Sequence, residues 1–345
     1  LVLAGVGIGG YWAYKHRPPA PTTAASDYSG AGEGAVEVEI PDGASGQEIG
    51  KILYDKGVVA SVGAFADAYA ANTNSGNIQA GIYTLKTKMS AANAVAALLD
   101  PASQTRRLTI PEGFTQTQVK EKLMSTGGFT AAEVDAAFAD AAGIGLPAVA
   151  GGHVEGWLAP DTYNISQGAT ATEVVAEMVK RTVSRLKNAG VAEADYETVL
   201  IKASIVEREA TPAYYGQVAR VIDNRLADTD GDTQGKLGMD STILYGLGRS
   251  GGMPTQAELD DASNPYNTRI HPGLPPTPIG SPGKGTITAV LNPPAGDWLY
   301  FVTINLDTGE TRFASTYAEQ QANEQLLQQY CAANEAKCSS GTHKS

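Results

Sequence analysis

Alternating hydrophobic and polar positions mark the first patterned part of the chain. Val36-Glu37-Val38-Glu39-Ile40 alternates with a period of two and runs into the turn residues Pro41-Asp42-Gly43. This pattern predicts a strand with one buried face, followed by a turn. Beyond the turn we expect two helices, a short strand and a third helix, at Ser45–Tyr54, Ser61–Ala71, Gly81–Leu85 and Ala91–Leu99. Together these elements predict a small α+β module over residues 36–104.

A second strand and turn, Arg107–Ile110 and Pro111–Gly113, open the next part of the chain. The openings VEIPDG and LTIPEG are alike, and the sequence alone leaves open whether they record a duplication or a coincidence. Apolar residues at helical spacing follow, with helices expected at Thr115–Thr126, Ala131–Ala142, Ala171–Ala189 and Tyr196–Ala210, and then a helix that carries Arg220, Asn224 and Arg225. We therefore predict a larger mixed α/β domain over residues 105–328 and a C-terminal tail over residues 329–345.

The chain begins with the apolar run LVLAGVGIGGYWAY, followed by Lys15-His16-Arg17. Spanning a bilayer takes roughly 20 apolar residues, so the run is interpreted as part of a truncated transmembrane helix over residues 1–15. A cleaved signal peptide and a buried core helix are the alternatives. Residues 16–35 are rich in Pro, Ala and Gly, which predicts a linker.

Composition narrows the class of protein. The chain has 345 residues, 42% of them hydrophobic and 18% charged, which is typical of a globular protein with more than one domain. Its net charge of −12 argues against a nucleic-acid partner. Cys331 and Cys338 form either a local disulfide or two free thiols, and with no histidine pair nearby they make a poor zinc site. We expect neither a metal nor an organic cofactor.

Two carboxylates, Glu207 and Glu209, end the apolar helix Tyr196–Ala210. They are about 200° apart on a helix, so only one can point straight into a given cleft. A carboxyl group at the end of an apolar stripe can be desolvated, which raises its pKa and keeps it protonated as a general acid. The spacing does not choose between the two, and both could instead be solvated or paired with neighbouring arginines.

Other polar residues surround this helix in the sequence. Asn224, Arg225, Asp240 and Tyr245 follow it, and the Pro- and Gly-rich segment at 264–283 comes next. Such a segment is either an ordered loop that forms a ligand wall or a plain connector. Upstream, the loop at 154–163 brings Glu155 together with Trp, Tyr and Pro residues suited to a sugar face.

Several long motifs occur in one order along residues 36–325: LTIPEGFT at 108–115, VEGWLAPDTY at 154–163, ASIVERE at 203–209, VARVIDNRL at 218–226, MDSTILYG at 239–246, YNT and GLPPTPIGSPG within 266–283, and LYFV at 299–302. In these motifs the chain resembles the MltG/YceG family of membrane-anchored endolytic murein transglycosylases. The resemblance implies a LysM-like module before a YceG-like catalytic domain. It also implies a single plasma-membrane helix, an extracytoplasmic catalytic domain and contact with the cell-wall synthesis machinery.

The resemblance further implies the reaction. An enzyme of this family would cleave the MurNAc–GlcNAc β-1,4 bond of nascent peptidoglycan and leave 1,6-anhydroMurNAc ends, which could terminate strand elongation. One carboxylic acid protonates the leaving oxygen and then acts as the base while the MurNAc C6 hydroxyl closes on C1. Because the nucleophile is intramolecular, a second carboxylate is unnecessary.

Carried over by position, the acid lies within Glu207–Glu209, and Glu209 is favoured over Glu207. The chain departs from the family with Ala210 where Thr is common and Ser241 where Pro is usual. Five residues are predicted to bind or order the saccharide: Glu155, Asn224, Arg225, Asp240 and Tyr245. A hydrolytic muramidase and a peptidoglycan-binding scaffold without activity are the alternative functions.

Overall fold

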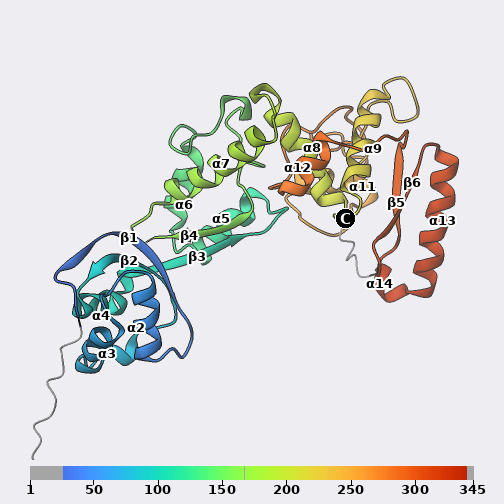
Figure 1. Ribbon diagram of the computed structural model, residues 1–345. Helices are drawn as coiled ribbons and strands as arrows, with labels where there is room; N and C mark the ends of the chain where they lie inside the picture. The colour runs from blue at the N-terminus through green and yellow to red at the C-terminus, as the bar shows by residue number, and fades with distance from the viewer. Residues whose placement is uncertain (1–25, 167, 340–345) are drawn as a thin grey trace, which may run out of the picture. The chain divides into compact units, whose positions relative to one another are not determined.

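The computed structural model describes residues 26–166 and 168–339, which form two compact units divided between Arg106 and Arg107 (Figure 1). The predicted transmembrane helix, residues 1–15, lies outside these ranges. Within them, no helix combines the length and apolar character needed to cross a membrane. Both helices and strands are present, as the sequence predicted.

The first unit pairs two antiparallel strands and packs helices against them. Val38 lies opposite Tyr83 in the strand pair, and the core contains Leu53, Phe65 and Val95. The start of β3 adds to β2 through the pairs Ile82–Thr105 and Tyr83–Gln104. The elements are β1 (Ala31–Ile40), α2 (Gly46–Asp55), α3 (Val62–Ala71), β2 (Gly81–Met89) and α4 (Ala91–Leu99).

Strand β1 begins five residues before the predicted start at Val36, so the prediction of a linker up to residue 35 is wrong at its end. Ala31 lies opposite Met89, and Glu33 lies opposite Thr87. The register then shifts between Glu33 and Val36. The glycines here remove the side-chain alternation that would reveal a strand, while the backbone still pairs.

The second unit contains most of the helices. β3 and β4 are neighbouring strands, and the hydroxyls of Thr109 and Thr162 lie 3.0 Å apart. The elements are β3 (Gln104–Ile110, which crosses the division), α5 (Gln116–Ser125), α6 (Ala131–Ala139), β4 (Asp161–Ile165), α7 (Ala171–Asn188), α8 (Tyr196–Glu209), α9 (Tyr215–Ala227), α10 (Asp240–Gly246), α11 (Gln256–Leu259), α12 (Lys284–Leu291), β5 (Tyr300–Asn305), β6 (Glu310–Ala314), α13 (Tyr317–Ala333) and α14 (Glu335–Ser339).

Two apolar clusters support this unit. The larger contains the fully buried Trp157, and the smaller packs α8 on α9 through residues such as Ile205 and Ile222. Because eight residues of α8 are buried along its length, its C-terminal end is held in a fixed position. This is the end that carries Glu207 and Glu209.

Residues 329–339, which belong to the predicted C-terminal tail, lie almost wholly in helices. Helix α13 continues to Ala333 alongside β5 and β6 (Figure 1), and α14 follows. A capping box between Thr316 and Glu319 starts α13. A disulfide joins Cys331 to Cys338, whose Cα atoms are 5.6 Å apart, and ties the two helices together.

Candidate active site

Glu207 is held by three hydrogen-bond donors. Its Oε1 accepts from the Tyr215 hydroxyl at 3.1 Å, and its Oε2 accepts from the Gly283 N–H and the Thr286 hydroxyl, both at 2.9 Å. Glu207 therefore anchors the end of the Pro- and Gly-rich segment at the start of α12, a structural role.

Glu209 has a different environment. The Ser241 N–H donates to its Oε1 at 3.3 Å, a long hydrogen bond. Burial raises the pKa of the Glu209 carboxyl, the neighbouring Asp240 raises it further, and the Ser241 contact and the Arg208 guanidinium oppose the rise. A carboxylic acid that keeps its proton can give it to a leaving oxygen, so the site chemistry favours Glu209 as the general acid.

Glu155 is 1% exposed and joins three parts of the second unit. Its carboxyl accepts from the Gln116 N–H at 3.0 Å, the Gly156 N–H at 3.3 Å and the Tyr245 hydroxyl at 2.9 Å. Burial, its largest influence, raises the pKa of Glu155 to about 7 despite these donors. Two residues predicted for the site, Glu155 and Tyr245, are thus in direct contact although 90 positions separate them.

Two clefts flank the first turn of α5. The first cleft has a volume of about 540 Å³ and the second of about 350 Å³, both within the range of roughly 300–1,000 Å³ typical of ligand sites. Tyr245 and Tyr266 line both clefts, with ring centroids 4.9 Å apart in an edge-to-face pair. The first cleft is lined by Thr115, Thr117, Gln118, Glu121, Tyr245, Gly246, Gly248, Arg249, Ser250 and Tyr266. The second is lined by Gln116, Lys120, Asp135, Phe138, Ala139, Gly152, His153, Val154, Glu155, Tyr245, Tyr266 and Thr277.

Glu209 lines neither cleft directly, but short links connect it to both. Ser241, its hydrogen-bond donor, lies one helical turn before Tyr245 on α10. Its neighbour Arg208 donates to the Ser250 carbonyl at 2.5 Å, and Ser250 lines the first cleft. The charge of Arg208 also acts on both Glu155 and Glu209. The predicted acid therefore lines neither cleft and is linked to both through neighbouring residues.

Asn224 and Arg225, both predicted to bind substrate, donate to backbone carbonyls. Asn224 binds the carbonyls of Gly296 and Trp298, at 3.1 and 2.8 Å. Arg225 binds the Leu299 carbonyl at 2.5 Å and also the carbonyl of Leu237. These contacts hold the segment before β5 against α9. Substrate binding by either residue stays a prediction.

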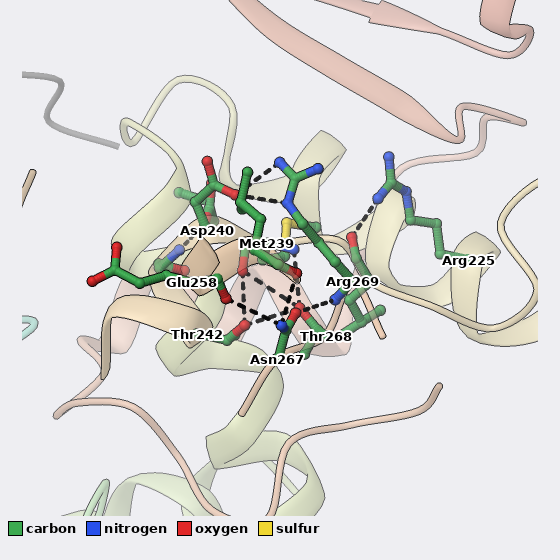
Figure 2. A network of polar contacts seen from close by, with 12 residues as sticks. Arg225, Met239, Asp240, Thr242, Glu258, Asn267, Thr268 and Arg269 are labelled. Atoms are coloured by element: carbon green, nitrogen blue, oxygen red, sulfur yellow. Dashed lines mark hydrogen bonds and ion pairs between the residues drawn. The ribbon is translucent and has the colours of Figure 1, made fainter. Parts of the chain in front are cut away.

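Asp240, also predicted for the site, is paired with Arg269, whose Nε and Nη2 donate to one carboxylate oxygen at 2.9 and 2.8 Å. Figure 2 shows this pair beside a buried network in which the Thr268 hydroxyl meets the Thr242 hydroxyl at 2.9 Å. Asn267 donates from the same loop to the Leu259 and Asp261 carbonyls, both at 3.0 Å. The Pro- and Gly-rich loop is thus ordered here by its buried polar side chains.

Replacing Asn267 by Ala should lower the free energy of unfolding by about 2 kcal/mol, because the carbonyls of Leu259 and Asp261 lose a buried donor. Asn267 is fully buried, whereas Asn188, at the end of α7, is exposed. Chemical denaturation of Asn267→Ala beside Asn188→Ala measures the effect. Equal stability of the two variants would show that Asn267 does not order the loop.

The sequence missed some residues that shape the clefts. Tyr266 belongs to the YNT motif, but no role in binding was predicted for it. Gln116 contributes a backbone N–H to Glu155, and no pattern of side chains predicts such a contact. Arg208 was seen only as a partner for the glutamates, whereas it also binds the carbonyl of Ser250. In residues 26–166 and 168–339, no group of three or more His, Cys, Asp or Glu side chains could hold a metal ion.

Comparison with known proteins assigns this fold to a class. A crystal structure of a Listeria monocytogenes protein described as YceG-like is similar, with a TM-score of 0.54 and 27% identity, over 84% of this chain and 98% of that one. The model of the YceG-like family matches residues 38–326. The chain belongs to the YceG-like family.

Curated relatives carry a more specific name. The endolytic murein transglycosylases of two Streptococcus pneumoniae strains, D39 and R6, are each 28% identical to this chain over 367 aligned positions. The alignments cover 94% of this chain and 63% of each relative. The chain therefore spans less than two thirds of the length of these relatives.

Proposed function

We propose that this chain is an endolytic peptidoglycan lytic transglycosylase. It cleaves the MurNAc–GlcNAc β-1,4 bond of nascent glycan strands and leaves 1,6-anhydroMurNAc ends. The observation that carries the proposal is the place of Glu209, a partly buried carboxyl at the fixed end of α8 that is joined through Ser241 to the helix lining clefts of ligand size, and burial raises its pKa. Membership of the YceG-like family and the name of the pneumococcal relatives support the same activity.

The reaction needs one carboxyl group acting twice. Glu209 gives its proton to the glycosidic oxygen, and the bond from that oxygen to C1 breaks. The Glu209 carboxylate then takes the proton of the MurNAc C6 hydroxyl as O6 bonds to C1, which closes the anhydro ring and restores the acid. Glu207 is engaged by three donors, so this nearest carboxylate is not free to activate water. Its engagement supports the transglycosylase over a hydrolase that would use Glu207 as its base.

Mass spectrometry of the products tests the reaction. The chain is incubated with uncrosslinked nascent glycan strands, and we expect anhydro-ended fragments, lighter by one water than hydrolysis products. Reducing-ended fragments would mean a hydrolytic muramidase. Glycan binding with no fragment under any condition would mean a binding scaffold without activity.

We also propose that the protein works outside the cytoplasm, anchored by a single plasma-membrane helix. The apolar run at 1–14 supports the anchor, and the disulfide of Cys331 with Cys338 suits an oxidising compartment. In this setting the module at 36–104 would bind glycan as a LysM-like domain, and wall-synthesis proteins would be neighbours. An orientation assay on the membrane-bound protein, with reporters on either side of residues 1–15, tests the topology.

A further inference from the structure

The likeness of VEIPDG and LTIPEG extends well beyond those six residues. In each unit a strand ends at Ile-Pro, turns at a glycine with positive φ and enters a helix through a capping box. Gly43 and Gly113 have φ of 70° and 76°, and the boxes are formed by Ser45 and Thr115. A second helix, a strand and a third helix follow in the same order in both: α3, β2 and α4 in one, α6, β4 and α7 in the other.

One side-chain contact marks both copies in the same place. The Tyr83 hydroxyl on β2 donates to the carbonyl of Gln79, four residues earlier, at 2.7 Å. The Tyr163 hydroxyl on β4 donates to the carbonyl of Ala159, again four residues earlier, at 2.6 Å. The same contact therefore occurs at the same place in both segments. Residues 36–99 and 106–188 share one β-α-α-β-α order, and they are called the first and second module copies below.

The copies differ in the length of the third helix, 9 residues in α4 and 18 in α7, and in the connection between the second helix and the second strand. In the first copy it covers residues 72–80, and in the second it covers residues 140–160. The longer connection carries Gly152, His153, Val154 and Glu155, all of which line the second cleft. The other walls come mostly from the two helices of the same copy, α5 and α6. The second cleft is thus largely built by the second module copy.

The lining of this cleft suits a polar ligand with apolar faces. Lys120 is paired with Asp135 at 2.7 Å, and its ammonium lies 4.8 Å from the centre of the Phe138 ring. The carboxyl of Glu155 is occupied by its three donors. His153 and Thr277 add polar groups beside the rings of Phe138 and Tyr266. Rings beside hydrogen-bonding groups match the alternating faces of a sugar.

We propose that the second cleft is a separate saccharide subsite, supplied by a second copy of the module, that binds the glycan strand beyond the first cleft. Tyr245 and Tyr266 are common to both clefts, so one strand can pass over this tyrosine pair and occupy both. The inference rests on the proposed function for its ligand. The duplicated module and the cleft that it builds are independent of the reaction.

The test fills the second cleft without touching the acid. Ala139, exposed at the end of α6, lines this cleft, whereas Ala136, exposed on the same helix, does not. Ala139→Trp and the matched control Ala136→Trp are made in the full chain carrying Glu209→Gln. Isothermal titration then measures the binding of a GlcNAc–MurNAc disaccharide and of an uncrosslinked octasaccharide to each. Thermal unfolding checks that each variant is folded.

We expect Ala139→Trp to bind the octasaccharide about tenfold more weakly than the parent, about 1.4 kcal/mol, and the disaccharide equally well. Ala136→Trp should match the parent for both ligands. Unchanged octasaccharide binding in Ala139→Trp would overturn the subsite. So would the absence of binding of either ligand to the parent, which is the full chain carrying Glu209→Gln alone. Cleavage of the octasaccharide by the Glu209→Gln chain would contradict the acid assignment alone, since the binding comparison does not depend on it.

Discussion

Replacing Glu209 by Gln is expected to reduce kcat about a thousandfold while leaving the fold intact. An amide cannot give a proton to the glycosidic oxygen, and positioned proton transfer contributes roughly 10²–10⁴-fold to rate. The Gln oxygen can still accept from the Ser241 N–H, so the end of α8 keeps its contact. Release of anhydro-ended fragments from glycan strands, followed over time by mass spectrometry, measures the change.

Glu207→Gln is the matched control, because it makes the same change two residues away. An amide has one acceptor oxygen, whereas Glu207 uses both of its oxygens for three donors. We therefore expect this variant to lose about 1–3 kcal/mol of stability and to keep its activity at temperatures where it is folded. An active Glu209→Gln beside an inactive, folded Glu207→Gln would move the acid to Glu207.

Replacing Glu155 by Gln is expected to stabilise the protein at pH 8 by up to about 3 kcal/mol relative to pH 5. The pKa of the Glu155 carboxyl is about 7 in the folded protein and 4.5 when the group is not buried, as in the unfolded chain. Between pH 4.5 and pH 7, the folded protein therefore binds a proton at Glu155 that the unfolded chain has lost. Stability from this group is therefore present below pH 4.5 and lost as pH rises through 7. Gln imitates the protonated form and removes that loss.

Urea unfolding of the parent and of Glu155→Gln at several pH values measures the difference. Glu197, whose pKa is also raised to about 7 by burial, contributes a similar slope to both proteins and cancels in the comparison. Glu197→Gln is the matched control, and it should keep the part of the slope that belongs to Glu155. Parallel curves for the parent and Glu155→Gln would show that Glu155 is already ionised at neutral pH.

The local parts of the fold could be predicted from the sequence. Helices beginning after Ser45, Ser61, Thr115 and Thr170 start where predicted to within a residue, because each cap is a short-range contact between a hydroxyl and a nearby N–H. Helix α6 ends at Ala139, three residues before the predicted end at Ala142. The predicted start of strand β1 was five residues too far along the chain, because a glycine-rich stretch can pair through its backbone without an alternating side-chain pattern.

The candidate site was predictable only in part. The sequence named Glu155 and Tyr245 but could not show that they touch, since their contact depends on packing across 90 positions. It could not separate Glu207 from Glu209, because the difference lies in donors from α9, α12 and α10 that only the folded chain brings near. Polar residues such as Asn224 look alike in sequence whether they face a ligand or a carbonyl.

The contacts of Arg225 set a limit on how far this protein can be shortened. One guanidinium holds the carbonyl of Leu299, just before β5, and the carbonyl of Leu237, just before α10. Helix α10 in turn carries Ser241 and Tyr245, which donate hydrogen bonds to Glu209 and Glu155. A fragment that lacks Leu299 and β5 would lose one of the two carbonyls that Arg225 binds, and the position of α10 would be less well fixed. The smallest functional fragment therefore has to extend through the C-terminal hairpin, far beyond the last residue that lines a cleft.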